Sequence, residues 1–196
     1  MARTRMRHDR YCIGGHDLDH KFRPVRIQDK YGDSWPEDAP FRPGQIWDMK
    51  YFAKNGRKPH VEDVMVNEYR PVGRVDDLKA LVLRHARPWS GGCDVLFDRT
   101  VRRTPSGANY IPSSGKLPKC STGYWIPDRD LECRAYGTRV RVVGEDASGI
   151  RTFPWVGAHE PPERIVAGEL VRVSLSRRFG SESAPAGYYV QISGVM

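Results

Sequence analysis

The stretch Gly44-Gln45-Ile46-Trp47-Asp48-Met49-Lys50-Tyr51-Phe52 decides the fold class of this chain. Trp47, Met49 and Tyr51 fall on one side of an alternating pattern, which has the two-residue period of a β-strand. A glycine at the start of a long alternating strand is typical of small barrels, because the strand must bend sharply to close the sheet. The stretch therefore predicts a long strand in a small barrel.

The rest of the chain has the same texture of short strands and tight turns. The 19 glycines and 15 prolines are spread as single residues along 196 positions, between runs of β-branched and aromatic side chains. Further strands are expected at 11–15, 22–27, 61–69, 94–97, 139–143, 150–153, 170–175 and 188–192. Helical periodicity is convincing only at 76–87, where Asp77 supplies an N-terminal cap and Pro88 follows the last turn.

This layout predicts an all-β protein with one or two short helices, arranged as two small barrels in tandem. The first barrel is expected at 10–92, with the connecting helix at about 76–87, and the second at 93–196. Residues 1–9 carry Arg3, Arg5 and Arg7 without any periodicity. They predict a flexible basic arm that adds phosphate affinity without sequence preference.

Composition limits the class of function. Lys and Arg number 32 against 24 Asp and Glu, so the net charge of +8 favours polyanions or acidic proteins as partners. No apolar run approaches the ~18 residues of a membrane span, and the arginine-rich start is not followed by the apolar region of a signal peptide. We expect a cytoplasmic protein without a membrane partner, whose four sparse cysteines are reduced thiols.

Catalytic and metal-binding patterns are weak. Cys12, His16 and His20 lie close in sequence, but the cysteines lack the paired spacing of zinc sites, so buried thiols and solvent-facing imidazoles are the simpler interpretation. The acidic turns at 16–20 and 60–63 could hold a divalent ion for phosphodiester cleavage, although ordinary polar turns have the same composition. We expect no metal, no cofactor and no enzyme activity. An autonomous metal-dependent nuclease remains the third alternative.

Basic residues interleaved with aromatic residues are the most informative feature. Single-stranded nucleic acid is held by cations on its phosphates and by flat rings stacked on its bases. The competing interpretation places the rings in the core and the arginines on the solvated face.

Several segments together resemble the dual OB-containing domain proteins of bacteria. They are Cys12-Ile13-Gly14-Gly15, Phe22-Arg23-Pro24-Val25, Pro40-Phe41-Arg42-Pro43-Gly44-Gln45-Ile46-Trp47, Pro59-His60-Val61-Glu62-Asp63 and the C-terminal stretches 161–163, 167–175 and 189–194. The resemblance spans most of residues 10–196, but Gln45 stands where the family usually has an acidic residue. It implies a tandem OB fold that binds nucleic acid or acts as a scaffold, often encoded beside helicases and nucleases of anti-phage systems.

We therefore expect a non-catalytic nucleic-acid-binding subunit of a bacterial complex, for single-stranded or frayed DNA or RNA, with a helicase or nuclease as its larger partner. The alternative is a structural adaptor that holds an effector enzyme through protein contacts. An OB barrel binds ligands on its second and third strands. The candidate binding residues are Arg23, Arg26, Trp47 and Tyr51 in the first barrel, and Arg139, Arg141 and Arg172 in the second.

Overall fold

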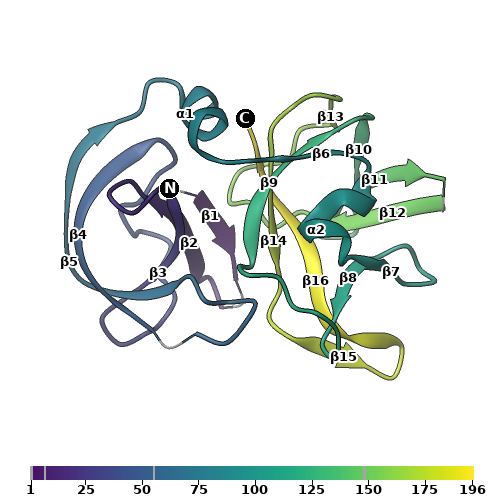
Figure 1. Ribbon diagram of the computed structural model, residues 1–196, viewed down its shortest axis with the longest axis horizontal. Coiled ribbons are helices and arrows are strands. Elements are labelled where there is room, and N and C mark those ends of the chain that lie inside the picture. The colour runs from purple at the N-terminus through teal and green to yellow at the C-terminus, as the bar shows by residue number, and fades with distance from the viewer. Residues whose placement is uncertain (1, 7, 55, 148) are drawn as a thin grey trace.

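The computed structural model, which describes residues 2–6, 8–54, 56–147 and 149–196, builds its N-terminal half from one curled sheet of five strands (Figure 1). These are β1 (Ala2–Arg5), β2 (Tyr11–Asp17), β3 (Arg23–Gln28), β4 (Gln45–Ala53) and β5 (Asp63–Arg74). Their order in the sheet is β1-β2-β3-β5-β4, and β3 and β5 are parallel. The sheet is a curled half-barrel, because the order ends at β1 on one side and β4 on the other.

The strand predicted from Gln45 is confirmed as β4. Gly44 precedes it with a φ of +79°, a left-handed conformation that favours glycine. On β4, Trp47, Met49 and Tyr51 pack against the core, as their alternation requires. The buried centre of this core includes Ile13, Ile27, Phe41, Val64 and Val66.

Helix α1 (Leu78–His85) connects the two halves and lies inside the predicted range. The Asp77 side chain accepts a hydrogen bond from the Ala80 backbone N–H at 2.8 Å, which caps the first turn. Val82 is buried in a cluster with Phe22 from the first half and with Tyr124 and Leu170 from the second. The helix therefore seals one end of the junction between the halves.

The C-terminal half contains a seven-stranded sheet and a four-stranded sheet around one core that includes Leu96, Trp125, Phe153, Val173 and Ile192. The larger sheet is formed by β6 (Trp89–Gly91), β7 (Arg102–Arg103), β8 (Asn109–Pro112), β9 (Thr122–Pro127), β14 (Val171–Leu175), β15 (Phe179–Ser181) and β16 (Ala184–Val195). The smaller one is formed by β10 (Leu131–Tyr136), β11 (Arg139–Asp146), β12 (Gly149–Pro154) and β13 (Arg164–Ile165). A 3₁₀ turn (Cys93–Val95) and α2 (Leu96–Arg99) complete this half.

The predicted all-β class with short helices is confirmed, but two local expectations are wrong. The segment 94–97 is not a strand, because a 3₁₀ turn leads into the left-handed residues Phe97 and Asp98, with φ of 48° and 57°. Residues 2–5 are not a free arm. They form β1, which pairs with β2, and Arg3 is buried.

Arg3 explains why β1 is fixed. Its guanidinium donates hydrogen bonds to the carbonyls of Glu37 at 2.6 Å, Ala39 at 3.0 Å and Phe41 at 3.3 Å. The arginines that suggested a mobile arm thus include one buried side chain, Arg3, and one exposed side chain, Arg5, of a short strand. Arg7 lies outside the described residues.

Strand β1 also joins the two halves. The Arg5 backbone N–H donates to the Val156 carbonyl at 2.8 Å, and the Ala158 N–H donates to the Arg3 carbonyl at 3.1 Å. On the other side of the junction, the buried Glu62 carboxylate accepts hydrogen bonds from the backbone N–H and the hydroxyl of Ser121. The halves are therefore connected by backbone and buried polar contacts. No helix in the described ranges is long and apolar enough to cross a membrane.

Candidate nucleic-acid interface

A groove of about 1020 Å³ runs between the two halves, and we call it the interlobe groove. Its walls come from β1 to β3 on one side and from β11, β14, β15 and β16 on the other. Seven described arginines and two carboxylates line it: Arg5, Arg10, Arg26, Arg141, Arg172, Arg177 and Arg178, with Asp33 and Glu62. The groove therefore concentrates positive charge where the two halves meet.

Most of this charge is not neutralised by the protein. Within the described residues, five groove arginines have no carboxylate oxygen within 4.0 Å: Arg5, Arg10, Arg141, Arg172 and Arg178. Glu62 accepts hydrogen bonds from Ser121 and pairs with none of these arginines. An anion entering the groove would meet these guanidinium groups without displacing an existing ion pair.

Aromatic rings accompany the cations. Phe179 in β15 is 51% exposed, and its ring meets that of Tyr189 edge-on at 5.9 Å between centroids. Tyr189 in turn stacks on Tyr110 at 5.6 Å. The groove thus contains aromatic rings of the kind on which unpaired bases stack.

Arg26 has a structural role in the groove wall. It pairs through two nitrogens with the carboxylate of the buried Asp63, and Arg177 reaches the same carboxylate at 2.8 Å. Removing one partner of a buried pair leaves a charge without compensation. Arg26 therefore holds β3 to β5 and positions Arg177, and it is not a free phosphate ligand.

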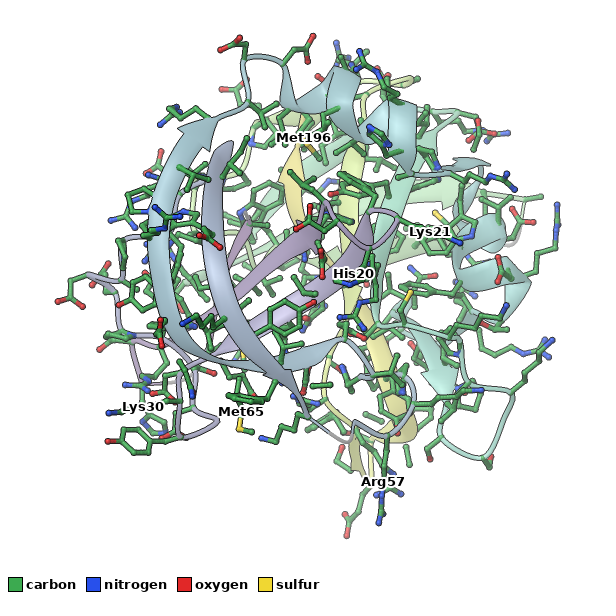
Figure 2. The ribbon with its side chains drawn as sticks, turned by 60° about the vertical axis from the view of Figure 1, so that its left-hand side comes forward. His20, Lys21, Lys30, Arg57, Met65 and Met196 are labelled. Carbon is green, nitrogen blue, oxygen red and sulfur yellow. The ribbon has the colours of Figure 1, made fainter. Side chains whose placement is uncertain are left out.

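A second hollow, the concave pocket, has a volume of about 770 Å³ and opens on the inner side of the curled sheet. Figure 2 shows the turn that carries His20 and Lys21, and the C-terminal Met196, on the inner side of the curl formed by β4 and β5. Trp47, Tyr51 and Arg172 line this pocket. The Tyr51 hydroxyl donates to the Asp17 carboxylate and accepts a hydrogen bond from Arg23 at 3.1 Å.

Trp47 also belongs to the core. Its ring packs edge-on against Phe41 at 5.0 Å, and its indole N–H donates to the Gln45 side chain at 3.3 Å. One face of the Trp47 ring therefore packs against the core, as the competing interpretation of the aromatic residues expected. The other side of the ring faces the pocket.

His16 in β2 forms part of the pocket wall. Its ring stacks on Phe22 at 4.1 Å with an angle of 12° between the planes, and lies 5.6 Å from the ring of Tyr124. Burial, together with the nearby Arg172 guanidinium, lowers the pKa of His16 to about 3. The imidazole is therefore neutral at physiological pH.

The structure distributes the seven predicted residues over two hollows. Arg26, Arg141 and Arg172 line the groove, whereas Trp47, Tyr51 and again Arg172 line the pocket. Arg23 reaches the pocket through Tyr51, and Arg139 lines neither hollow, because it lies at the turn end of β11.

Sequence reasoning did not select Arg5, Arg10, Arg178, Phe179 or His16 as site residues. The run Arg177-Arg178-Phe179 carried the signal of basic and aromatic interleaving, and the N-terminal arginines were expected to add phosphate affinity only as part of a flexible arm. That they face one groove depends on how the halves pack, which no local pattern encodes. His16 was weighed only as a metal ligand, and the expectation that its imidazole faces the solvent is wrong. Its ring is largely buried, because its stacking partner Phe22 and its charged neighbour Arg172 come from other segments of the chain.

The described residues contain no group of three or more His, Cys, Asp or Glu side chains arranged to hold a metal ion. Cys12 lies in the groove beside Arg26, and burial raises the pKa of its thiol. Cys12 is therefore in its neutral thiol form.

Comparison with known proteins gives little. No protein-family model matches the sequence, and no curated protein matches it. Among solved structures, the chain has a distant match to a murine DNA binding protein determined in complex with double-stranded DNA. The identity is 11% over 98% of this chain and 86% of the murine chain, and the TM-score is 0.33.

Proposed function

We propose that this chain binds single-stranded DNA or RNA along the interlobe groove, as a non-catalytic subunit of a bacterial complex. One observation carries the proposal: five arginines from both halves face a single groove without a carboxylate partner in the described part of the chain. Each guanidinium that contacts a phosphate releases a condensed counterion, which favours binding at low salt. A helicase or nuclease as larger partner, acting in anti-phage defence, rests on the resemblance of the sequence to the dual OB-containing proteins.

The rings in the groove favour a single strand over a duplex. Phe179 and Tyr189 are positioned to stack on bases, and only unpaired bases present a free face to a side chain. Such stacking contributes about 1–3 kcal/mol per base. Phosphate contacts would then position the strand, and the rings would select its unpaired form.

A different surface favours the adaptor alternative. No described strand pairs with the outer edge of β4, so the outward N–H and C=O groups along this nine-residue strand are available to a strand of another protein. Phe52 and Val72 are 58% and 54% exposed on β4 and β5. A partner bound there would bury apolar surface, and its affinity would change little with salt.

The first test measures the affinity for a labelled oligothymidylate of about 20 nucleotides as a function of KCl concentration. Five phosphate contacts predict a slope of log K against log salt of about −3.5, at ~0.7 per contact on single strands. The double variant Arg141→Ala/Arg178→Ala should reduce the slope by about 1.4 and weaken binding, because two phosphate contacts are lost.

The matched control is Arg84→Ala/Arg129→Ala, which removes the same charge from exposed positions outside the groove. It should retain the slope of the unmodified protein. Equal slopes for the two double variants would show that the groove is not the binding surface. Salt-independent binding to a protein partner, without nucleic-acid affinity, would support the adaptor instead.

A further inference from the structure

The interlobe groove and the concave pocket meet at two side chains. Val25 and Arg172 line both hollows, so Arg172 lies between them. One of its nitrogens donates to the Ser193 hydroxyl at 2.7 Å. The other terminal nitrogen of the guanidinium lies over Gly14, and a Cβ atom added at Gly14 would be 2.3 Å from that nitrogen. The absence of a side chain at Gly14 thus makes room for this cation.

The pocket wall beside Arg172 offers unused hydrogen-bonding capacity. The His16 side chain makes no hydrogen bond within the described residues, and neither ring nitrogen is fully shielded from solvent. A neutral imidazole presents one donor and one acceptor. These two atoms therefore face the pocket and can serve a polar ligand.

The rest of the pocket suits a flat aromatic ligand. Phe22, Trp47, Tyr51 and Tyr124 contribute rings to its walls, together with aliphatic side chains of α1. The acidic groups are largely engaged, because Asp17 is bonded to Tyr51 and Asp48 to Arg70 at 2.8 Å. A volume of about 770 Å³ falls within the ~300–1,000 Å³ of small-molecule sites, and exceeds the need of one base and its sugar.

We propose that the concave pocket binds one nucleotide unit, with its base between the aromatic walls and its phosphate on Arg172. His16 would hydrogen-bond the edge of the base. The nucleotide is either free or part of a strand whose backbone lies in the groove, and only the second case rests on the proposed function. Arg172 serves both cases, since it faces the groove and the pocket together.

Methionine methyl groups report on the two hollows separately. Met49 and Met196 line the pocket, Met6 lines the groove, and Met65 lines neither. Figure 2 shows Met65 and Met196 far apart on the molecule. The experiment labels the methionine methyl carbons of the full chain with ¹³C and follows their NMR signals during titration with adenosine 5′-monophosphate, and separately with the oligothymidylate.

We expect adenosine 5′-monophosphate to shift Met49 and Met196 saturably and to leave Met65 unchanged, because a stacked base imposes a ring-current field on nearby methyl groups. If the nucleotide belongs to a bound strand, the oligothymidylate shifts Met6 together with Met49 and Met196. If both probes shift Met49 and Met196 but not Met6, nucleotide binding in the pocket is supported and strand binding in the groove is refuted. Shifts of Met6 alone retain the groove and overturn the pocket. No shift from either probe overturns both.

Gly14→Ala tests the role of Arg172 without removing it. The new methyl group displaces the flexible end of the Arg172 side chain, while Gly14 has an ordinary strand conformation. We expect the Gly14→Ala protein to bind adenosine 5′-monophosphate about ten-fold more weakly than the unmodified protein does. Adenosine alone and inorganic phosphate alone should bind weakly to the unmodified protein, because each makes only part of the contacts. Gly73→Ala, whose Cβ would be 4.0 Å from Ile46, is the matched control and should bind normally. Normal nucleotide affinity in Gly14→Ala would refute the placement of the phosphate on Arg172.

Discussion

His16 shows how the surroundings of a single residue fix its charge. The same side chain in a polar turn would titrate near 6.5, but stacking between Phe22 and Tyr124 removes it from water, and Arg172 opposes a second positive charge. The pocket wall is therefore uncharged at this position over the whole physiological range. A neutral imidazole can both donate to and accept from the edge of a base, which an imidazolium cannot do.

The buried neutral His16 makes stability depend on pH. Between pH 6.5 and about 3 the unfolded chain binds a proton that the folded chain does not, so stability falls as the pH is lowered. The expected loss is about 1.4 kcal/mol per pH unit below 6.5, or about 2 kcal/mol at pH 5. Urea unfolding at pH 7.5, 6 and 5 measures it.

The control for this effect is His16→Gln, which cannot titrate. It shares every other titratable group with the unmodified protein, so the difference between the two isolates His16. The His16→Gln protein should lose about 2 kcal/mol less stability between pH 7.5 and pH 5. Parallel pH profiles would mean that His16 is already accessible to protons in the folded chain.

At the scale of the element, β1 differs most from its sequence pattern. Arg3 and Arg5 are two residues apart in the same strand, yet their surroundings differ. Arg3 is buried on backbone carbonyls, whereas Arg5 is exposed in the groove. The pair therefore separates a structural arginine from a proposed binding arginine within one short strand.

Arg3→Ala should lower the free energy of unfolding by about 2–4 kcal/mol, because three carbonyl groups lose their donor in a buried site. Arg5→Ala should change it by less than about 0.5 kcal/mol and should weaken binding of the oligothymidylate instead. Urea unfolding and fluorescence anisotropy measure the two effects. Equal stability of the two variants would restore the interpretation of this segment as a free arm.

Elements with strong local signals were predictable, and those that depend on distant partners were not. The alternation after Gly44 and the capped apolar spacing after Asp77 are local features, so β4 and α1 follow from them. Strand β1 has no apolar pattern, because its central arginine is satisfied by carbonyls some 36 residues away. The left-handed turn at Phe97 likewise interrupts a run that is rich in strand-forming residues.

The candidate site follows the same division. The sequence indicated arginines and aromatic rings on strands, and three of the seven chosen residues line the groove. It could not separate Arg26, which pairs with buried Asp63, from Arg141, which has no carboxylate partner among the described residues. The two have the same chemistry and the same strand setting, and only tertiary contacts distinguish them.

At the scale of the whole molecule, the contacts between the halves predict cooperative unfolding. Strand β1 bonds to residues 156–158, and buried Glu62 bonds to Ser121. Unfolding enthalpy is about 0.7 kcal/mol per residue near 60 °C, so a single unit of this length predicts a van't Hoff enthalpy of about 140 kcal/mol. Halves that unfold independently would give about 70 kcal/mol each. Scanning calorimetry compares the van't Hoff and calorimetric enthalpies directly.

The position of β1 also has a consequence for biosynthesis. One edge of this strand pairs with residues 156–158, which are translated far later than the strand itself. Strands β2 to β5 can assemble from neighbouring sequence, but β1 remains exposed on one edge until most of the chain has emerged. Unpaired strand edges are the surfaces through which nascent chains associate wrongly. The arginines of β1 reduce this hazard, because charged side chains on an edge discourage pairing with other chains.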